Sequence, residues 1–129
     1  ENPRNLAPFV RYLMERSATF QQIIDSLSNQ PKDRAARVTM FLYDLDRTLD
    51  PIVQSLRQDA YMIWIVGNRH VGGMEIRTDQ ILGELLAIRQ VEPVASVPRK
   101  ILFRRMATRN RIASMMRQEH IMVFRKRGE

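Results

Sequence analysis

The clearest pattern of apolar positions in the chain is a continuous run at residues 61–66, with the sequence YMIWIV. Gly67-Asn68 ends the run, and Gly72-Gly73 follows shortly after. A continuous apolar run bounded by turn residues predicts a strand that is buried on both faces, as in a parallel sheet. Ligands of open α/β sheets bind beyond the carboxyl ends of such strands, so residues 67–77 are predicted to form a functional rim.

Other apolar residues recur at intervals of three or four, which predicts helices. The expected spans are about 5–27, as one or two helices, 34–57 and 79–90. Asp50-Pro51 interrupts the second span. We expect a kink or two abutting helices there, with Asp50 as the N-cap and Pro51 at the first helical position. Thr78 or Asp79 is the predicted cap of the third helix.

Two further strands are predicted, at about 91–97 and 120–125. Pro93 and Pro98 place the first of them at or near a sheet edge, because proline cannot donate a ladder hydrogen bond. Residues 99–118 are predicted to be a basic loop or a short helix. The order of elements predicts an α/β fold, a half-sheet with helices on its faces, in a single domain over residues 1–129.

Charge is divided unevenly along the chain. Residues 1–64 carry 8 Lys/Arg and 8 Asp/Glu, whereas residues 65–129 carry 13 Lys/Arg and 6 Asp/Glu. Such a one-sided distribution indicates a polyanionic partner, most simply nucleic acid, although a solvated basic tail is the alternative. The candidate nucleic-acid contacts in the basic segment are Arg99, Lys100, Arg104, Arg105, Arg109 and Arg111.

The rim adds two further candidates, Asn68 and Arg69. A glycine at position 67 lets a ligand approach the backbone, and an asparagine can hydrogen bond to a base edge. An ordinary turn is the competing interpretation of Asn68. Gly72-Gly73 is predicted to be a hairpin turn, since neither a dinucleotide fingerprint nor a P-loop surrounds it.

Several classes of site are disfavoured by composition. The chain has no Cys and two His, which excludes a disulfide framework or thiolate site and argues against zinc. Asp44, Asp46 and Asp50 could suggest metal binding, and Asp46 and Asp50 lie one helical turn apart. We expect instead a solvated helix face holding Arg47, with no metal. No catalytic residue is assigned.

The chain has neither an apolar run long enough to cross a bilayer nor a signal-peptide pattern. We expect a soluble, cytoplasmic protein without a membrane partner. Because the first residue is Glu1 and not Met, we also expect a processed chain or a piece of a longer polypeptide.

The order of elements and certain residues resemble the C-terminal half of the class I S-adenosylmethionine-dependent methyltransferases. The likeness is greatest to bacterial DNA methyltransferases of restriction–modification systems that modify cytosine N4 or adenine N6. The resemblance covers about residues 35–127. The residues that carry it are Ile65-Val66-Gly67-Asn68, Gly72-Gly73, Ile76, Thr78-Asp79, Ile81-Leu82-Glu84-Leu85 and the terminal segment EHIMVFRK at 119–126.

This resemblance implies a partial Rossmann-like sheet. Residues 61–66 would form its fifth strand, and the strands at 91–97 and 120–125 would be the closing pair. Three features of the family are absent from this chain: the glycine-rich turn after the first strand, the acidic residue after the second, and the Asp/Asn-Pro-Pro-aromatic motif after the fourth. No cofactor-binding residue is therefore assigned, and S-adenosylmethionine would be bound mainly by a second polypeptide.

The resulting hypothesis is a split, heterodimeric DNA methyltransferase, or a fragment of one. This chain would complete the catalytic fold, contribute DNA contacts and be inactive alone. One alternative is a non-enzymatic basic nucleic-acid-binding or adaptor module, and another is an assembly domain that pairs through a bare strand edge. We also expect self-association through that exposed edge.

Overall fold

The structure is a computed structural model that describes residues 5–31, 33–102 and 116–128. Helices and strands are mixed, consistent with the predicted α/β class. The helices are α1 (Ala7–Arg16), α2 (Ala18–Ser28), α3 (Arg34–Gln54) and α4 (Thr78–Ile88). The strands are β1 (Tyr61–Gly67), β2 (Arg69–Val71), β3 (Met74–Ile76), β4 (Val91–Leu102) and β5 (Met116–Lys126).

Two side chains join the amino-terminal helices to α4. Ser17 separates α1 from α2, and its hydroxyl accepts a hydrogen bond from the Phe20 backbone N–H at 3.0 Å, as an N-cap does. The Ser17 hydroxyl also donates to Glu84 of α4 at 2.5 Å, and the Thr19 hydroxyl donates to the same carboxylate at 2.7 Å. A carboxylate at the positive end of α2 is favourable, so Glu84 ties the two helices together.

Helix α3 includes Pro51 as one continuous element, so the predicted N-cap at Asp50 and the alternative of two abutting helices are wrong. Pro51 lies in the last turns of the helix, where its missing N–H costs one hydrogen bond and the apolar stripe continues. Leu49 and Val53, on either side of it, are both buried. Burial of this stripe outweighs the local preference of proline for a helix start.

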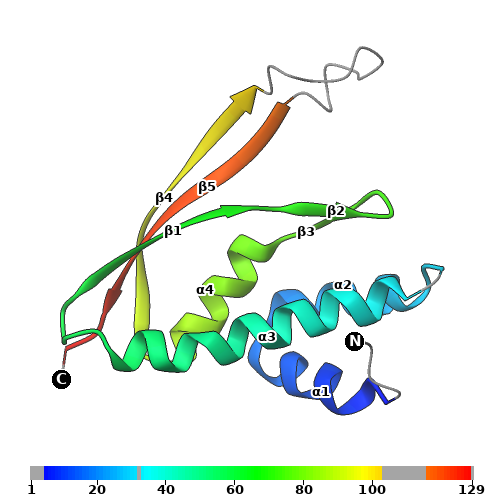
Figure 1. The fold of residues 1–129 in the computed structure, drawn as a ribbon, viewed down its shortest axis with the longest axis horizontal. Coiled ribbons are helices and arrows are strands. Elements are labelled where there is room, and N and C mark those ends of the chain that lie inside the picture. Colours follow the sequence, from blue (N-terminus) through cyan, green and yellow to red (C-terminus); the bar gives the residue numbers. More distant parts are fainter. Residues whose placement is uncertain (1–4, 32, 103–115, 129) are drawn as a thin grey trace.

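The main sheet has three strands in the order β1-β5-β4, and every pairing is antiparallel. Because β1 and β4 are both antiparallel to β5, they run parallel to each other, and α4 is the crossover between them. Figure 1 shows α4 between the strands and the long helix α3, with β4 and β5 extending away from the helices as a ribbon.

The proposal that β1 is buried on both faces is wrong. Tyr61, Ile63 and Ile65 are 60%, 67% and 59% exposed, whereas the alternate residues Met62, Trp64 and Val66 face the core. Antiparallel strands commonly have one covered face, and here the helices cover one face only. Among the described residues, β1 has a hydrogen-bonded neighbour, β5, along one edge and none along the other.

Strands β4 and β5 are longer than predicted. Strand β4 does lie at the sheet edge, as Pro93 and Pro98 indicated, and it shifts register between Pro93 and Ala95. However, pairing continues from Arg99↔Glu119 to Leu102↔Met116, so the predicted loop at 99–118 is wrong at both ends. Residues 103–115, the middle of that segment, lie outside the described residues.

Candidate functional site

Asn68 connects the end of β1 to the start of α4. Its Oδ1 accepts a hydrogen bond from the Asp79 backbone N–H at 3.1 Å, and its Nδ2 donates to the Asp79 carboxylate at 2.9 Å. The same Nδ2 lies 3.1 Å from the Glu75 carboxylate. Neither Thr78 nor Asp79 provides the expected side-chain cap of α4. The Asn68 amide oxygen instead accepts from the Asp79 backbone N–H in the first turn of that helix. The contact of Asn68 with DNA stays a prediction, and the structure shows its amide already engaged.

Asp79 is the centre of this network and is 6% exposed. The Arg77 guanidinium donates to both carboxylate oxygens, at 3.1 and 3.0 Å, and His120 Nε2 lies 3.7 Å away. Burial alone would raise the pKa of Asp79, but the hydrogen bonds from Arg77 and Asn68 outweigh burial and hold that pKa below its ordinary value of 3.8. The carboxylate therefore stays charged at neutral pH and holds Asn68 and Arg77 of the rim against the start of α4.

The β2–β3 hairpin forms the outer part of the rim. Gly72 and Gly73 adopt φ values of +59° and +83°, which confirms the predicted hairpin turn. A Cβ added at Gly72 would overlap the tips of the Gln30 and Arg34 side chains. Gln30 donates to the Val71 carbonyl oxygen at 3.2 Å, and Arg34 donates to Gln30 at 3.2 Å. The glycine thus allows the hairpin to approach the start of α3.

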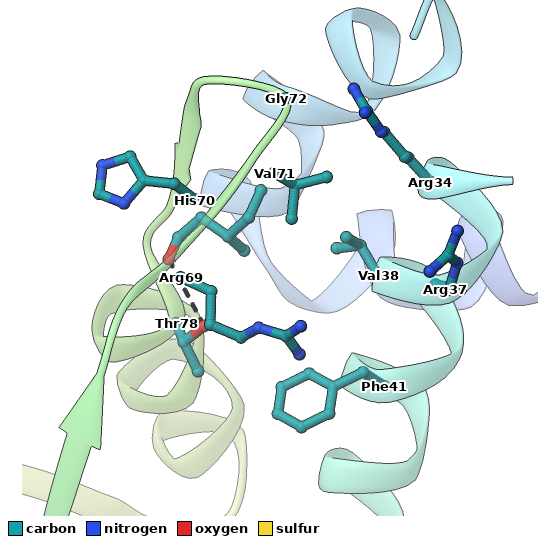
Figure 2. Close-up of a pocket in the computed structure, with 10 residues that line it drawn as sticks. Arg34, Arg37, Val38, Phe41, Arg69, His70, Val71, Gly72 and Thr78 are labelled. Atoms are coloured by element: carbon teal, nitrogen blue, oxygen red, sulfur yellow. Dashed lines mark hydrogen bonds between the residues drawn. The ribbon is translucent and has the colours of Figure 1, made fainter. Parts of the chain in front are cut away.

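A pocket of about 390 Å³ lies between this hairpin and α3. Arg69 lines it from β2, and Arg34, Arg37 and Phe41 line it from α3. In Figure 2 the Arg69 side chain extends into the pocket towards Phe41, whereas the His70 ring points away from α3. The sequence signal found Arg69 but missed Arg34, Arg37 and Phe41, because their helical spacing indicated nothing more than an amphipathic face.

Several basic residues in the described part of β4 and β5 have partners within the chain. Arg99 lies 2.9 Å from Glu119 on the neighbouring strand, and Arg125 lies 3.0 Å from Asp59. The Lys126 ammonium donates to the carbonyl oxygens of Val53 and Leu56, at 3.0 and 2.8 Å. It therefore caps the carboxyl end of α3. Arg99 is thus the one described candidate of the basic segment whose charge is paired within the chain.

The remaining predicted DNA contacts divide into two groups. Lys100 is an exposed residue of β4. Arg104, Arg105, Arg109 and Arg111 lie outside the described residues. These assignments stay predictions.

Asp46 belongs to a buried ion pair, so the expected solvated helix face is wrong at this residue. Its side chain is fully buried, with Oδ1 3.0 Å from Arg89 Nη2 and Oδ2 accepting from the Tyr12 hydroxyl at 2.5 Å. Burial, and then the hydrogen bond to Asp46, raise the pKa of Tyr12. Arg89 also pairs with Asp50 at 2.8 Å. This cluster joins α1, α3 and the end of α4.

Two further findings concern metals and membranes. Among residues 5–31, 33–102 and 116–128, no three acidic or histidine side chains are grouped as ligands for a metal ion. No helix in the described part of the chain is long and apolar enough to span a bilayer.

The face of the sheet that the helices leave open is apolar. Cross-strand pairing aligns Ile63, Val123 and Ala95 in one row across the three strands, and Ile65, Ile121 and Val97 in the next. Ile63, Ile65 and Val97 are all more than half exposed. We call this surface, residues 61, 63, 65, 97, 121 and 123, the open face. Its exposed apolar side chains and its position beside the unpaired edge of β1 are typical of an interaction surface.

Comparison with known proteins supports the resemblance to methyltransferases. The chain is 32% identical over 94 residues to the type II methyltransferase M.MvaI of Kocuria varians. The matched segment is 73% of this chain but 21% of that protein, so the chain spans about a fifth of its relative. No family model matches the chain, and no solved structure matches it. The match supports a relationship between this chain and the DNA methyltransferases.

Proposed function

We propose that this chain is the C-terminal part of a DNA methyltransferase of Rossmann-like fold, and that its open face receives the part that binds S-adenosylmethionine. The similarity to a type II methyltransferase over 94 residues carries the proposal. The arrangement of the strands supports it. Strands β1 and β4 run parallel and are connected through α4, and β5 lies between them, antiparallel to both. The family resemblance implies such a closing pair, β4 and β5, after the fifth strand.

The cofactor-binding half would add strands to the free edge of β1. Ladder hydrogen bonds would satisfy the unpaired backbone groups of that edge, and helices of the added half would cover Ile63, Ile65 and Val97. The rim at 67–77 would then lie beside the reacting centre. The added half would provide the S-adenosylmethionine site and the Pro-Pro-aromatic motif, whether on another polypeptide or on another part of one longer polypeptide.

The roles of this chain's own residues follow from the rim. The Asn68–Asp79–Arg77 network holds the end of β1 rigidly against α4, and this network would position the rim while the target base is out of the duplex. Arg69 and the basic residues at 99–111 would contact phosphates. The methyl group itself is supplied by S-adenosylmethionine.

Reconstitution tests the proposal. The chain is mixed with a polypeptide that carries the glycine-rich turn and the Pro-Pro-aromatic motif. Transfer of a radiolabelled methyl group from S-adenosylmethionine to DNA is then measured. We expect no transfer by either part alone and transfer by the mixture. Inactivity of a correctly folded, stable complex on every DNA offered would reject the proposal.

A non-enzymatic nucleic-acid-binding module is the second candidate, and the basic pocket between α3 and the hairpin favours it. This candidate predicts binding that is independent of any methyl donor. It also predicts that Ile63→Lys, on the open face, leaves nucleic-acid binding intact. The methyltransferase proposal predicts that this substitution abolishes reconstituted activity.

A further inference from the structure

The pocket between α3 and the β2–β3 hairpin combines an apolar floor with a cationic rim. Val38 and Ile76 are buried at its base, and Val71 packs against the core beside them. Arg34, Arg37 and Arg69 stand around it, and the lining includes no acidic residue. An anionic ligand with an apolar part fits such a surface, and a volume of about 390 Å³ falls in the range of small-ligand sites.

The three arginines differ in how far their charge is already used. Arg37 donates two hydrogen bonds to Asp33, at 3.0 and 2.7 Å. Arg34 contacts the neutral amide of Gln30, and within the described part of the chain neither Arg34 nor Arg69 has an acidic partner. Two guanidinium groups from different elements therefore line one pocket without an acidic partner among the described residues, Arg34 beside Gly72 and Arg69 beside Phe41 (Figure 2). Guanidinium groups in this arrangement bind phosphate oxygens with two hydrogen bonds each.

Phe41 adds an aromatic surface to the pocket. Its side chain is 46% exposed although it lies on the same helix as the buried Val38 and Leu42. In Figure 2 its ring lies beneath the Arg69 side chain, at the inner end of the pocket. An exposed aromatic ring next to arginines is the combination on which single-stranded nucleic acids bind, because bases stack on the ring and phosphates bind the cations.

We propose that this pocket binds an unpaired DNA strand, with one base stacked on Phe41, the phosphate of that nucleotide held by Arg69 and a neighbouring phosphate contacted by Arg34. The identity of the ligand rests on the proposed function, since a methyltransferase that flips its target base creates unpaired nucleotides. Gly72 is required for the site because a side chain there would displace Arg34. The residues of this site lie between positions 34 and 78, so the site is separate from the basic segment at 99–118.

Fluorescence anisotropy of a short labelled oligothymidine tests the site with this chain alone, without the methyl donor. Phe41→Leu is expected to weaken binding of the single strand about tenfold and to leave binding of a duplex of equal length unchanged, with Phe41→Trp restoring it. Arg69→Gln is expected to weaken binding and to reduce the slope of log affinity against log salt by about 0.7. Arg57→Gln, an exposed arginine beyond the far end of α3, is the matched control and should change affinity less than twofold.

Three results would overturn the inference. Equal losses for Arg57→Gln and Arg69→Gln would show diffuse attraction by net charge. Equal effects of Phe41→Leu on single strand and duplex would exclude stacking of an unpaired base. Competition by inorganic phosphate as effective as that by thymidine monophosphate would indicate a phosphate site alone. Because the assay needs no partner polypeptide, its failure is distinct from a failure of the reconstitution experiment.

Discussion

The two faces of the main sheet have similar apolar residues but opposite surroundings. On the face covered by α4, Phe124 is fully buried, and Met122 and Val66 are nearly so. On the open face, Ile63 and Ile65 are exposed although they belong to the same strand, β1. The period of two along a strand explains how one run of apolar residues reaches both faces. The covered face stabilises this chain, whereas the open face has chemistry suited to another polypeptide.

The largest expected effect concerns the covered face. Phe124→Ala should lower the free energy of unfolding by about 3–5 kcal/mol, because it leaves a cavity between β5 and the helices. Urea denaturation followed by circular dichroism measures this loss. Ile63→Ala, the matched truncation on the open face, should cost less than about 1 kcal/mol. Comparable losses at both positions would mean that the two faces are equally covered.

The second effect concerns the rim that joins the covered face to the hairpin. Asp79→Asn should lower the free energy of unfolding by about 1–3 kcal/mol at pH 7, since it removes charge-assisted hydrogen bonds from Arg77.

The folded-state pKa of Asp79 is depressed, so its stabilising contribution is present above pH 3.8 and is lost as the pH falls through the folded pKa. The difference between wild type and variant should therefore shrink below about pH 4. A difference that stays constant down to pH 2.5 would contradict the assigned role.

A smaller effect is expected at the C-terminal basic residues. Lys126→Met should lower the free energy of unfolding by about 1 kcal/mol, because the ammonium no longer caps α3. The affinity of the Lys126→Met variant for a single-stranded oligonucleotide should change less than twofold, whereas Arg69→Gln should weaken this binding. Thermal unfolding and anisotropy on the same samples separate the two roles of positive charge. If Lys126→Met lost affinity for the oligonucleotide and kept its stability, Lys126 would be a nucleic-acid contact and not a helix cap.

The smallest effect on stability is expected at the open face. Ile63→Lys should change the free energy of unfolding by no more than about 0.5 kcal/mol, because the side chain is 67% exposed. It should nevertheless reduce self-association of the isolated chain, since a charge on an exposed strand opposes edge and face pairing. Sedimentation velocity over a range of concentrations measures this. If the wild-type chain stayed monomeric at every concentration tested, the predicted self-association would be wrong.

The sequence alone predicted the parts of this protein that depend on neighbouring residues. The helices, the strand at 61–66, the glycine hairpin and the edge position of the segment with Pro93 and Pro98 all follow from periodicity and local backbone preference. These signals act over a few residues, and the structure confirms each of them. The sequence underestimated the lengths of β4 and β5, because the pairing that extends them joins residues 14 to 22 positions apart, from Leu102↔Met116 to Pro98↔His120.

Tertiary structure decided the features that depend on distant partners. An apolar run cannot reveal which of its faces is covered, so the exposure of Ile63 required knowledge of where α4 packs. The basic residues Arg99 and Lys126 resembled free positive charge until their partners, Glu119 and the end of α3, were placed beside them. The pocket of Arg34, Phe41 and Arg69 exists because the Gly72 hairpin folds back onto α3, a contact between segments that the order of residues does not show.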